Sequence, residues 1–528
     1  MLLMLVLQVE AGHSRKMMPL TIVLPTTYIK STKKKPLIKD LDIKQTPIVD
    51  EVEAGVVTEL LIKGLNAEHT AYYLDDLPLP TSLKGCEARL DKLPTMVTKG
   101  NGLAGAMIYT LPKNKFQTTM GVSTNAGMQN HTNFHTEKNN HFFTGEMIYN
   151  NDGGWNRTPW RYRQSGIKNK AASLEGVFQT GHQDAEQNLT ISSVNQYMQG
   201  INNNLNLPDA FDGEENESFF NLLGVSYERQ NWRGFTSLYG RKTTLTQQSG
   251  TQNIVLTAGV CKTESTHHFG VFTQQINNHK VYQYDVYGGK KIGPFYPSAR
   301  LIKTERHILC PFDITTQLAK PLKIVCGSAY RLPNDLELFS PFGNADLKPE
   351  HNYHCNIIHS FERSNWTVEQ TLFINHVTNL IEFSLQTNCS ANIGNLNTVG
   401  IDQSIGYDGF DRYKIGYSHT YCTLDGSQPV LSRPAWKFLV WQRFYLSDAC
   451  FIDLRAHFKG PYLSGDRETW KPKEMPGVFL LDVSTTHVLN KNWTVLCEIK
   501  NLTNRHYESP HGYLGKGIEA WVRFVYTI

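Results

Sequence analysis

From about residue 115 to its last residue, the chain repeats short stretches in which apolar and polar residues alternate, separated by clusters of Asn, Gly and Asp. Successive side chains of a β-strand point to opposite faces, so this alternation predicts strands with one apolar and one polar face. The last stretch shows it best: Ile518, Ala520, Val522, Phe524, Tyr526 and Ile528 oppose Glu519, Trp521, Arg523, Val525 and Thr527. Between strands, Asn490-Lys491-Asn492 predicts a tight turn. The pattern therefore indicates an all-β, antiparallel fold.

Two architectures can be built from such strands. In a soluble antiparallel sandwich the polar face meets water, whereas in a transmembrane barrel the apolar face meets lipid and the polar face lines the lumen. Charges of both signs on the polar faces suit a lumen, and they include Asp453, Arg455, Glu519 and Arg523. Aromatic residues near the strand ends suit an interfacial girdle, namely Trp436, Trp441, Tyr445, Trp493 and Tyr526. The alternation alone leaves both architectures open.

The chain contains no run of about 18 apolar residues, so membrane-spanning helices are not expected. A transmembrane barrel needs only segments of about 10 alternating residues, and it remains compatible with the sequence. If residues 113–528 form such a barrel, about 19 residues for each strand and its connection give room for about 22 strands.

Composition narrows the functional classes. The chain carries 52 Lys and Arg against 48 Asp and Glu, a net charge of +4, and this balance argues against a nucleic-acid-binding protein. The 9 cysteines are odd in number and form no Cys-x-x-Cys pair, so neither a disulfide framework nor a zinc ribbon is expected. Because the sequence has no nucleophile elbow, zinc-protease helix motif or phosphate-binding loop, an enzyme is not expected either.

Two stretches in the first 112 residues carry recognisable sequence motifs. Residues 61–70 read Leu-Ile-Lys-Gly-Leu-Asn-Ala-Glu-His-Thr, with Lys63-Gly64 at their centre, and an apolar stretch then ends at Asp75. A second stretch starts at Gly102 and continues through Gly105 to Thr110. Together they resemble the plug domain of TonB-dependent outer-membrane receptors, in which Arg-Gly stands where this chain has Lys63-Gly64.

Three later segments resemble the barrel of the same family. They are Tyr330 to Phe339, then Gly343-Asn344-Ala345-Asp346-Leu347-Lys348-Pro349-Glu350 with the strand Phe373 to Ile381, and finally Ile499 to Tyr507. The order matches the family across nearly the whole chain. The resemblance implies an all-β transmembrane antiparallel barrel of about 22 strands, with a small N-terminal α+β plug domain inside the lumen. It divides the chain into an N-terminal segment (1–30), a plug (31–112) and a barrel (113–528).

The chain also departs from the family pattern. In this family, the plug sequence normally contains an Arg-Gly-Pro group and a turn of small residues at the position of residues 94–102. Both are missing between Pro94 and Gly102 of this chain. The chain ends in Ile528, where such barrels prefer an aromatic residue. The apolar stretch Met1 to Leu7 is short for a signal peptide, and it is interpreted as a signal remnant. A reduced plug is therefore expected.

The resemblance implies a site for an energy-coupling partner. The TonB protein would add a strand to an extended, β-prone segment before the plug, and Thr21, Ile22, Val23 and Leu24 form the candidate. An ordinary plug strand is the competing interpretation of this short run. The expected partners are TonB, a small-molecule ligand and outer-membrane lipid, with no cofactor and no nucleic acid, and the protein is expected to act as a monomer.

Candidate ligand contacts come from aromatic and Arg residues, which often anchor ligands. They are Trp155, Trp160, Arg161 and Tyr162 in a loop-like stretch, and Tyr72 and Tyr73 in the plug. Girdle aromatics and plug packing are the respective alternatives. Asp209, Asp212 and Glu214 lie in an acidic stretch that suits calcium only loosely, and a solvated loop is favoured. His351 and His354, three apart on a strand, are expected on opposite faces, so no metal site is expected there.

The expected function is outer-membrane uptake of a scarce nutrient, a ferric siderophore or cobalamin, driven through TonB. One alternative is a degenerate, passive or adhesive outer-membrane barrel without energy coupling. The other is a soluble secreted β-sandwich binding protein, with which the Asn-x-Thr sites at Asn365, Asn492 and Asn501 are compatible.

Overall fold

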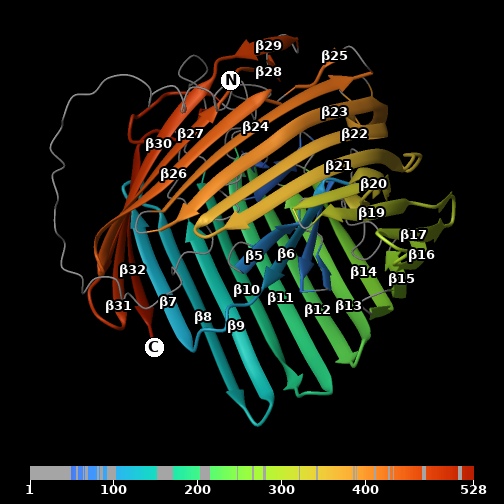
Figure 1. The fold of residues 1–528 in the computed structure, drawn as a ribbon, viewed down its shortest axis with the longest axis horizontal. Coiled ribbons are helices and arrows are strands. Elements are labelled where there is room, and N and C mark those ends of the chain that lie inside the picture. Colours follow the sequence, from blue (N-terminus) through green and yellow to red (C-terminus); the bar gives the residue numbers. More distant parts are fainter. Residues whose placement is uncertain are drawn as a thin grey trace. The chain divides into compact units, whose positions relative to one another are not determined.

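The strand-rich pattern folds into one closed barrel with a small sheet inside it (Figure 1). Chain contacts divide the protein into Met1–Ile38 and Lys39–Ile528, and every described residue belongs to the second unit. The computed structural model describes residues 49–54, 57–63, 65, 69–75, 77–79, 83, 87–91, 103–151, 170–202, 214–245, 248–263, 267–276, 281–319, 321–339, 343–384, 387, 389–409, 412–425, 428–431, 433–466, 471–508 and 514–528.

The barrel is a closed 22-strand antiparallel sheet, as the sequence predicts. Its first half consists of β7 (Phe116–Ser123), β8 (Met128–Lys138), β9 (His141–Asn151), β10 (Lys170–Gln183), β11 (Gln187–Asn202), β12 (Glu214–Arg229), β13 (Trp232–Leu245), β14 (Gln248–Thr263), β15 (His267–Ile276), β16 (Val281–Lys290), β17 (Phe295–Thr304), β18 (Ile308–Leu309), β19 (Phe312–Ala319) and β20 (Leu322–Arg331). β18 is a two-residue piece beside the β17–β19 pairing.

The second half consists of β21 (Glu350–Arg363), β22 (Trp366–Ser384), β23 (Cys389–Asp408), β24 (Arg412–Leu424), β25 (Gln428–Pro429), β26 (Trp436–Ser447), β27 (Cys450–Lys459), β30 (Val478–Val488), β31 (Trp493–Lys500) and β32 (Glu519–Thr527). β25 is, like β18, a two-residue piece, here beside the β24–β26 pairing, and neither piece is counted among the 22 strands. A short helix, α3 (Asp335–Phe339), precedes β21, and a separate hairpin of β28 (Tyr462–Gly465) and β29 (Pro472–Met475) follows β27. The barrel closes where β32 pairs with β7, with Val522 opposite Val122. A closed sheet rules out the two-sheet sandwich.

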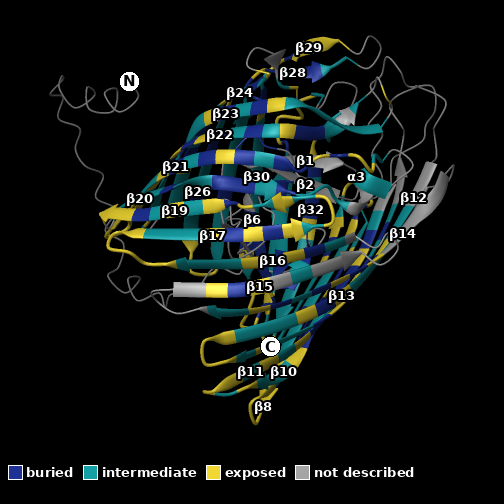
Figure 2. Ribbon diagram, turned by 90° about the vertical axis from the view of Figure 1, so that its right-hand side faces the viewer, coloured by how far each residue is buried: buried dark blue, intermediate teal, exposed yellow. Residues whose placement is uncertain are grey.

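The two faces of the barrel strands are inverted relative to a water-soluble protein. Large apolar side chains such as Phe524, Leu223 and Val286 are exposed on the outer face, whereas polar side chains such as Glu146, Gln196 and Asn375 are buried on the lumen face. Figure 2 shows buried, intermediate and exposed residues following one another along the barrel strands. An apolar outer face suits hydrocarbon, and a polar inner face suits a filled or watery lumen. The alternation predicted for β32 is confirmed, because Phe524 is 47% exposed and Glu519 only 2% exposed.

The strand connections differ between the two ends of the barrel. At one end, the short-turn end, brief turns join the strands, such as Asn139-Asn140, in which both residues have positive φ. The turn at Asn490 also lies there, and its side chain accepts hydrogen bonds from the Asn492 and Trp493 amides at 2.9 and 3.0 Å, which confirms the predicted turn. The amide of Glu186 and the side chain of His182 hold the pKa of Asp184, in another of these turns, at about 2. The longer connections, including that carrying α3, lie at the opposite loop end.

The aromatic girdle predicted from the sequence is correct for three residues and wrong for two. Trp436 packs on Phe458 and Trp493 on Tyr526, all on the outer face. Trp441 and Tyr445 instead face the lumen, because they lie an odd number of residues from Trp436 and so point to the opposite side of β26. There the Arg443 guanidinium lies 5.5 Å from the Trp441 ring.

Inside the barrel, the plug sheet consists of β3 (Thr70–Leu74), β4 (Leu77–Leu79), β5 (Glu87–Asp91) and β6 (Gly105–Thr110) in the order β4-β3-β6-β5. β3 and β6 are parallel, and the other pairs are antiparallel. A two-stranded sheet of β1 (Val49–Ala54) and β2 (Val57–Ile62) precedes it. The helical part expected for the plug has no counterpart among the described residues of this region.

The plug sheet packs on the lumen wall through two apolar clusters. The first joins Leu74, Leu77 and Met107 of the sheet to wall residues of β10–β12, which are Val177, Val194, Phe220 and Leu222. The second joins Leu65, Leu103 and Ala104 to residues of β20–β23, which are Ala329, Val377, Leu380 and Leu396. The lumen is therefore polar overall but carries apolar patches where the sheet rests.

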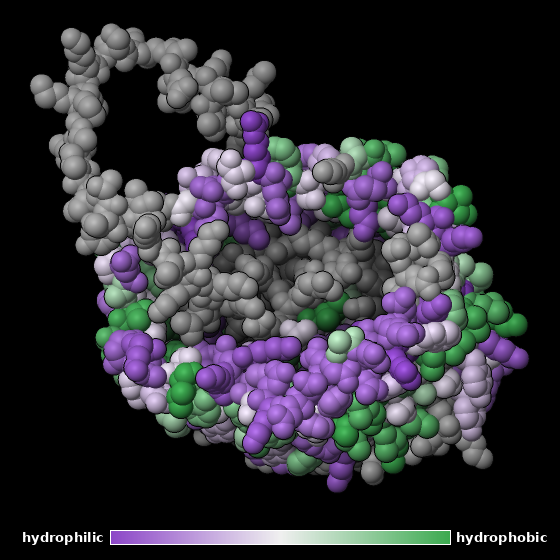
Figure 3. Space-filling view, turned by 60° about the horizontal axis from the view of Figure 1, so that its bottom comes forward, coloured by the Kyte–Doolittle hydropathy of each residue, from purple (hydrophilic) through white to green (hydrophobic). Residues whose placement is uncertain are grey.

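Seen toward one end, the barrel presents hydrophilic side chains around a hollow and hydrophobic side chains on its outer wall (Figure 3). Within the described residues, no helix has the length and apolar character needed to cross a membrane.

Candidate functional site

A buried charge cluster lies at the loop end of β20 and β21. The ladder places Arg331, the last residue of β20, opposite Glu350, the first residue of β21. The Arg331 guanidinium donates one hydrogen bond to Glu350 and two to Glu337 of α3, the latter at 2.8 and 2.9 Å. Paired, nearly parallel donors of this kind give geometric specificity as well as energy. The cluster therefore fixes α3 against the barrel rim.

The local sequence explains how the Glu337 carboxylate is held in position to accept hydrogen bonds from Arg331. The Asn334 side chain accepts a hydrogen bond from the Glu337 amide at 2.9 Å, and the Glu337 carboxylate accepts one from the Asn334 amide at 2.8 Å. This reciprocal arrangement caps the first turn of a helix, and Asn and Glu three residues apart are typical of it. The carboxylate is thus oriented before Arg331 reaches it.

The plug contributes a histidine to the same cluster. His69 Nε2 lies 2.9 Å from Glu350 Oε2, and both side chains are 0% exposed. The other carboxylate oxygen accepts a hydrogen bond from the Ile381 amide at 2.7 Å. Burying a carboxylate without partners costs several kcal/mol, so Glu350 is held charged by this set of donors. Breaking the His69 contact disturbs the whole group.

Lys63 makes a second polar contact between plug and wall. Its backbone has φ of 56°, and its ammonium donates to Asn356 Oδ1 at 2.7 Å and lies 5.7 Å from the Phe373 ring centroid. The side chain is almost completely buried. Asn356 and Glu350 share the lumen face of β21 because they lie an even number of residues apart. Lys63 and His69 therefore fasten the plug to one strand of the wall.

The opposite side of the plug is fastened by apolar contacts. Leu77 lies over Gly224 of β12, and a Cβ at that glycine would come within 2.5 Å of Leu77 Cδ1. Asp75, at the turn before β4, has φ of 52° and accepts a hydrogen bond from Gln179 of β10 at 2.8 Å. The absence of a side chain at Gly224 lets the plug approach the wall.

The structure places the predicted plug residues as follows. Lys63 and Asp75 contact the wall, Gly105 begins β6, and Gly64 and Gly102 lie outside the described residues. Tyr73 is buried, and that burial raises the pKa of its phenol well above the usual range against the opposing effect of Arg300. Tyr72 is half-buried, with its ring 6.5 Å from that of Tyr109. Both tyrosines therefore take part in plug packing.

The remaining predicted site residues lie largely outside the described residues. These are Thr21, Ile22, Val23 and Leu24, the aromatic and Arg group Trp155, Trp160, Arg161 and Tyr162, and Asp209 and Asp212. Glu214 begins β12. Within the described part of the chain, no group of three or more His, Cys, Asp or Glu residues is placed to hold a metal ion. His351 and His354 point to opposite faces of β21, as expected, with His351 stacked on Tyr330 and His354 in the lumen.

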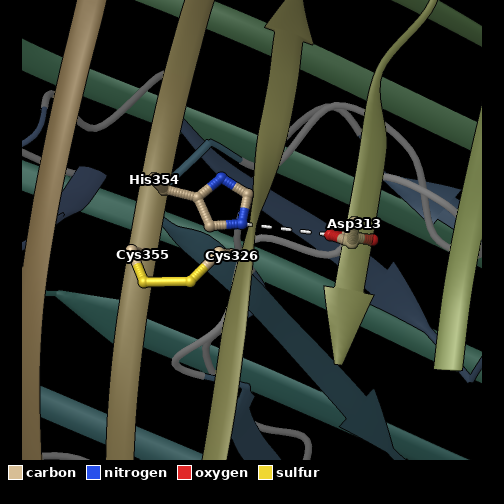
Figure 4. Close-up of a disulfide and its surroundings, with 4 residues drawn as sticks. All are labelled: Asp313, Cys326, His354 and Cys355. Carbon is tan, nitrogen blue, oxygen red and sulfur yellow. Dashed lines mark ion pairs between the residues drawn. A yellow bond between two sulfur atoms is a disulfide. The ribbon is translucent and has the colours of Figure 1, made fainter. Parts of the chain in front are cut away.

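A disulfide joins the two strands that carry the charge cluster. Cys326 of β20 lies opposite Cys355 of β21, and their sulfurs are bonded (Figure 4). The neighbouring His354 faces the lumen, 3.9 Å from Asp313, so the disulfide lies on the outer face. The sequence alone does not reveal this pair, because an odd number of cysteines without close spacing predicts no pairing; the alignment of β20 with β21 places the two cysteines side by side. Structural disulfides indicate an oxidising compartment.

Comparison with known proteins identifies the barrel. Residues 326–502 match the sequence model of the family described as TonB dependent receptor-like, beta-barrel. The chain carries a TonB-dependent receptor-like β-barrel. The receptor is therefore a protein of the outer membrane, and its class consists of transporters rather than enzymes. The matched segment contains Arg331, Glu337, Glu350 and both bonded cysteines.

Solved structures agree with the fold of the receptor. The FrpB iron transporter from Neisseria meningitidis (F5-1 variant) is 11% identical with a TM-score of 0.73, over 92% of this chain and 97% of that one. The siderophore receptor PirA from Acinetobacter baumannii is 12% identical with a TM-score of 0.73, over 93% and 96%. A point mutant of the ferric enterobactin receptor PfeA from Pseudomonas aeruginosa, in complex with enterobactin, is 11% identical with a TM-score of 0.72, over 92% and 96%.

Proposed function

We propose that the receptor takes up a scarce nutrient, a ferric siderophore or cobalamin, with energy supplied through TonB. The observation that carries this proposal is the plug sheet fastened within the lumen by His69–Glu350, Lys63–Asn356 and two apolar clusters. A barrel closed in this way passes a large solute only after the plug moves. Energy coupling supplies that movement.

The cargo class is supported by two features. The lumen wall is lined with polar and charged side chains, which suit a hydrophilic solute rather than a lipid. The similar solved structures are named as an iron transporter, a siderophore receptor and a ferric enterobactin receptor. A ferric siderophore is therefore favoured over cobalamin.

Each part of the proposed function is assigned to one segment of the sequence. Residues 31–112 form the plug and 113–528 the barrel of a monomer, and Thr21–Leu24 is the strand that TonB engages by β-addition. The candidate cargo contacts remain Trp155, Trp160, Arg161 and Tyr162, which lie in the sequence between β9 and β10. Tyr72 is the plug candidate that retains partial exposure.

The test is growth and radiolabelled uptake with ferric siderophores and cobalamin as sole sources, in cells with and without TonB. Deleting Thr21–Leu24 should abolish uptake and leave surface binding unchanged. A matched deletion of four residues within the apolar stretch Met1–Leu7 tests whether any N-terminal change has this effect, provided that the receptor still reaches the outer membrane. Uptake that persists without TonB would instead identify a passive barrel.

A further inference from the structure

The lumen face of the barrel is covered unevenly. On β21–β24, the lumen-facing side chains of Asn352, Asn375, Thr398 and Ser418 are at most 3% exposed. On β27 and β30–β32, the lumen-facing Asp453, Thr486 and Glu519 are also buried, at 2–6% exposed. A charged strip on these strands nevertheless keeps partial exposure to water, and it consists of Arg455, His457, Asp482, Glu498 and Arg523. The exposed fractions are 36% for His457, 18% for Asp482, 16% for Arg523 and 14% for Glu498.

The position of the plug accounts for this difference. Its apolar clusters rest on β10–β12 and on β20–β23, and its polar contacts reach Glu350 and Asn356 of β21. These stretches of wall lose their access to water. The charged strip lies on the wall between β26 and β7, away from both clusters in the order of the strands.

The chemistry of the charged strip suits reversible contact. Arg523 donates to Glu498 at 2.8 Å and to Gln129 at 3.0 Å, and its guanidinium lies 5.0 Å from the Trp521 ring. His457 lies 3.8 Å from Asp482, whose carboxylate also accepts the Asn501 amide at 2.8 Å. Partly exposed ion pairs of this kind contribute little net energy, because water competes for both partners. A polar solute can exchange with them in the same way.

Arg455 differs from the other members of the strip. It lies directly opposite Asp482 in the ladder, and its Nε atom has no hydrogen-bond partner among the described residues. A delocalised, weakly hydrated cation with free donors recognises carboxylates and other oxygen anions well. The strip thus includes a partly exposed arginine side chain of the kind that binds such anions.

We propose that a hydrophilic, charge-bearing cargo passes the plug along the wall formed by β27 and β30–β32, over the charged strip. The inference rests on the proposed function and deepens it by assigning the side of passage. The plug then need release only the space facing this wall, while its contacts with β10–β12 hold it in the barrel. Ser484, which lies between Asp453 and Glu498 in the ladder, is at the centre of the passage.

The first experiment tests whether the strip is open, and it needs no cargo. Ser484→Cys and Ser418→Cys replace lumen-facing serines on the open and covered walls, and each full-length receptor is treated in outer-membrane vesicles with a membrane-impermeant maleimide. After subtraction of wild-type labelling, Ser484→Cys should react about tenfold faster or more, because reactivity follows exposure. Equal rates at the two positions would overturn the inference.

The second experiment tests passage. Ser484→Trp narrows the open wall, whereas Val483→Trp places the same side chain on the outer face of the same strand. With radiolabelled ferric enterobactin, ferrichrome and cobalamin, Ser484→Trp should retain surface binding but lose uptake at least about tenfold, and Val483→Trp should retain both.

Normal uptake by Ser484→Trp would overturn the proposed route along β27 and β30–β32. Should Ser484→Trp fail to assemble, as judged by heat-modifiable mobility, Ser484→Phe replaces it with the same expectation. Should the wild-type receptor take up none of the probes, the proposed function fails and the passage with it, whereas the maleimide rates still report separately whether the wall is open.

Discussion

His69 and Glu350 lie 281 residues apart in the sequence and meet at 2.9 Å, with neither side chain exposed. Their contact joins the plug to the same carboxylate that Arg331 of the barrel binds. Because one buried carboxylate serves both parts, the closure of the lumen depends on the integrity of the barrel rim.

Glu350→Gln should therefore loosen the plug. The change leaves Arg331 and His69 around a neutral amide, and breaking a buried charge pair typically costs about 3–5 kcal/mol. We expect a lower midpoint in urea unfolding, followed by heat-modifiable mobility, and greater sensitivity of cells to a bulky antibiotic. The control is His69→Gln, which keeps a hydrogen-bond donor and should cost less; equal sensitivity of wild type and Glu350→Gln would contradict this view.

Lys63→Met should weaken the polar contact between the plug and Asn356 of the wall. Met has a similar length and loses the ammonium, so the side-chain amide oxygen of Asn356 is left without this donor at a cost of about 1–3 kcal/mol. Lys63→Arg keeps the charge at the position where the related plug motif has Arg, and it should remain close to wild type. The measurement is the unfolding free energy of each purified variant in detergent, compared with that of the wild type. An equal loss for the two variants would show that shape rather than charge matters here.

Gly224 and Leu77 should be coupled. Gly224→Ala places a Cβ where Leu77 Cδ1 lies 2.5 Å away, and such overpacking typically costs about 1–3 kcal/mol. Leu77→Ala removes the obstructing side chain, so the double variant should be more stable than the sum of the two single changes predicts. The unfolding free energies of all four proteins measure the coupling, and simple additivity would argue against contact between these residues.

Phe524→Lys should impair membrane insertion, whereas Val525→Lys should not. Phe524 is on the outer face of β32, two residues from the girdle residue Tyr526, and Val525 is on the lumen face. A Lys on the lipid face of a barrel costs from about 0–1 kcal/mol near the interface to about 2–4 kcal/mol at the midplane. The measurement is the fraction of receptor that becomes heat-modifiable in the outer membrane. Equal fractions for the two variants would place the two residues in similar surroundings.

The Cys326–Cys355 disulfide should form in the mature receptor. Alkylation before and after reduction, followed by mass spectrometry, should show both thiols protected until reductant is added. The bond closes a separation of 29 residues, so Cys326→Ser should lower the unfolding free energy by about 2–4 kcal/mol. The variant with both cysteines replaced should match Cys326→Ser, since either change removes the same bond; free thiols in the untreated wild type would refute the pairing.

The barrel could be predicted from the sequence because its signal is local. Alternation within β32 and β30, and turns such as that at Asn490, follow from neighbouring residues alone. The wrong prediction for Trp441 and Tyr445 also has a local cause, since a position near a strand end does not determine which face of the strand a residue takes. Counting from Arg443 would have placed both in the lumen.

The charge cluster could not be predicted in the same way. Lys63-Gly64 and Pro349-Glu350 marked the two segments by resemblance, but nothing in either segment shows that His69 meets Glu350 or that Lys63 meets Asn356. Such pairs depend on how the plug sits against the wall. The apolar patch on β10–β12 was equally hidden, because Val177 and Val194 interrupt a polar face only where the plug rests.

Two cross-links between β20 and β21 lie five positions apart on each strand: the pair Arg331 with Glu350, and the pair Cys326 with Cys355. An odd spacing places them on opposite sides of the sheet, one in the lumen and one toward lipid. Sliding β20 past β21 by two residues would return every side chain to its proper side, yet it would sever both bonds. The disulfide and the ion pair together thus permit a single register of β20 against β21, at the point where the plug is bound to the wall.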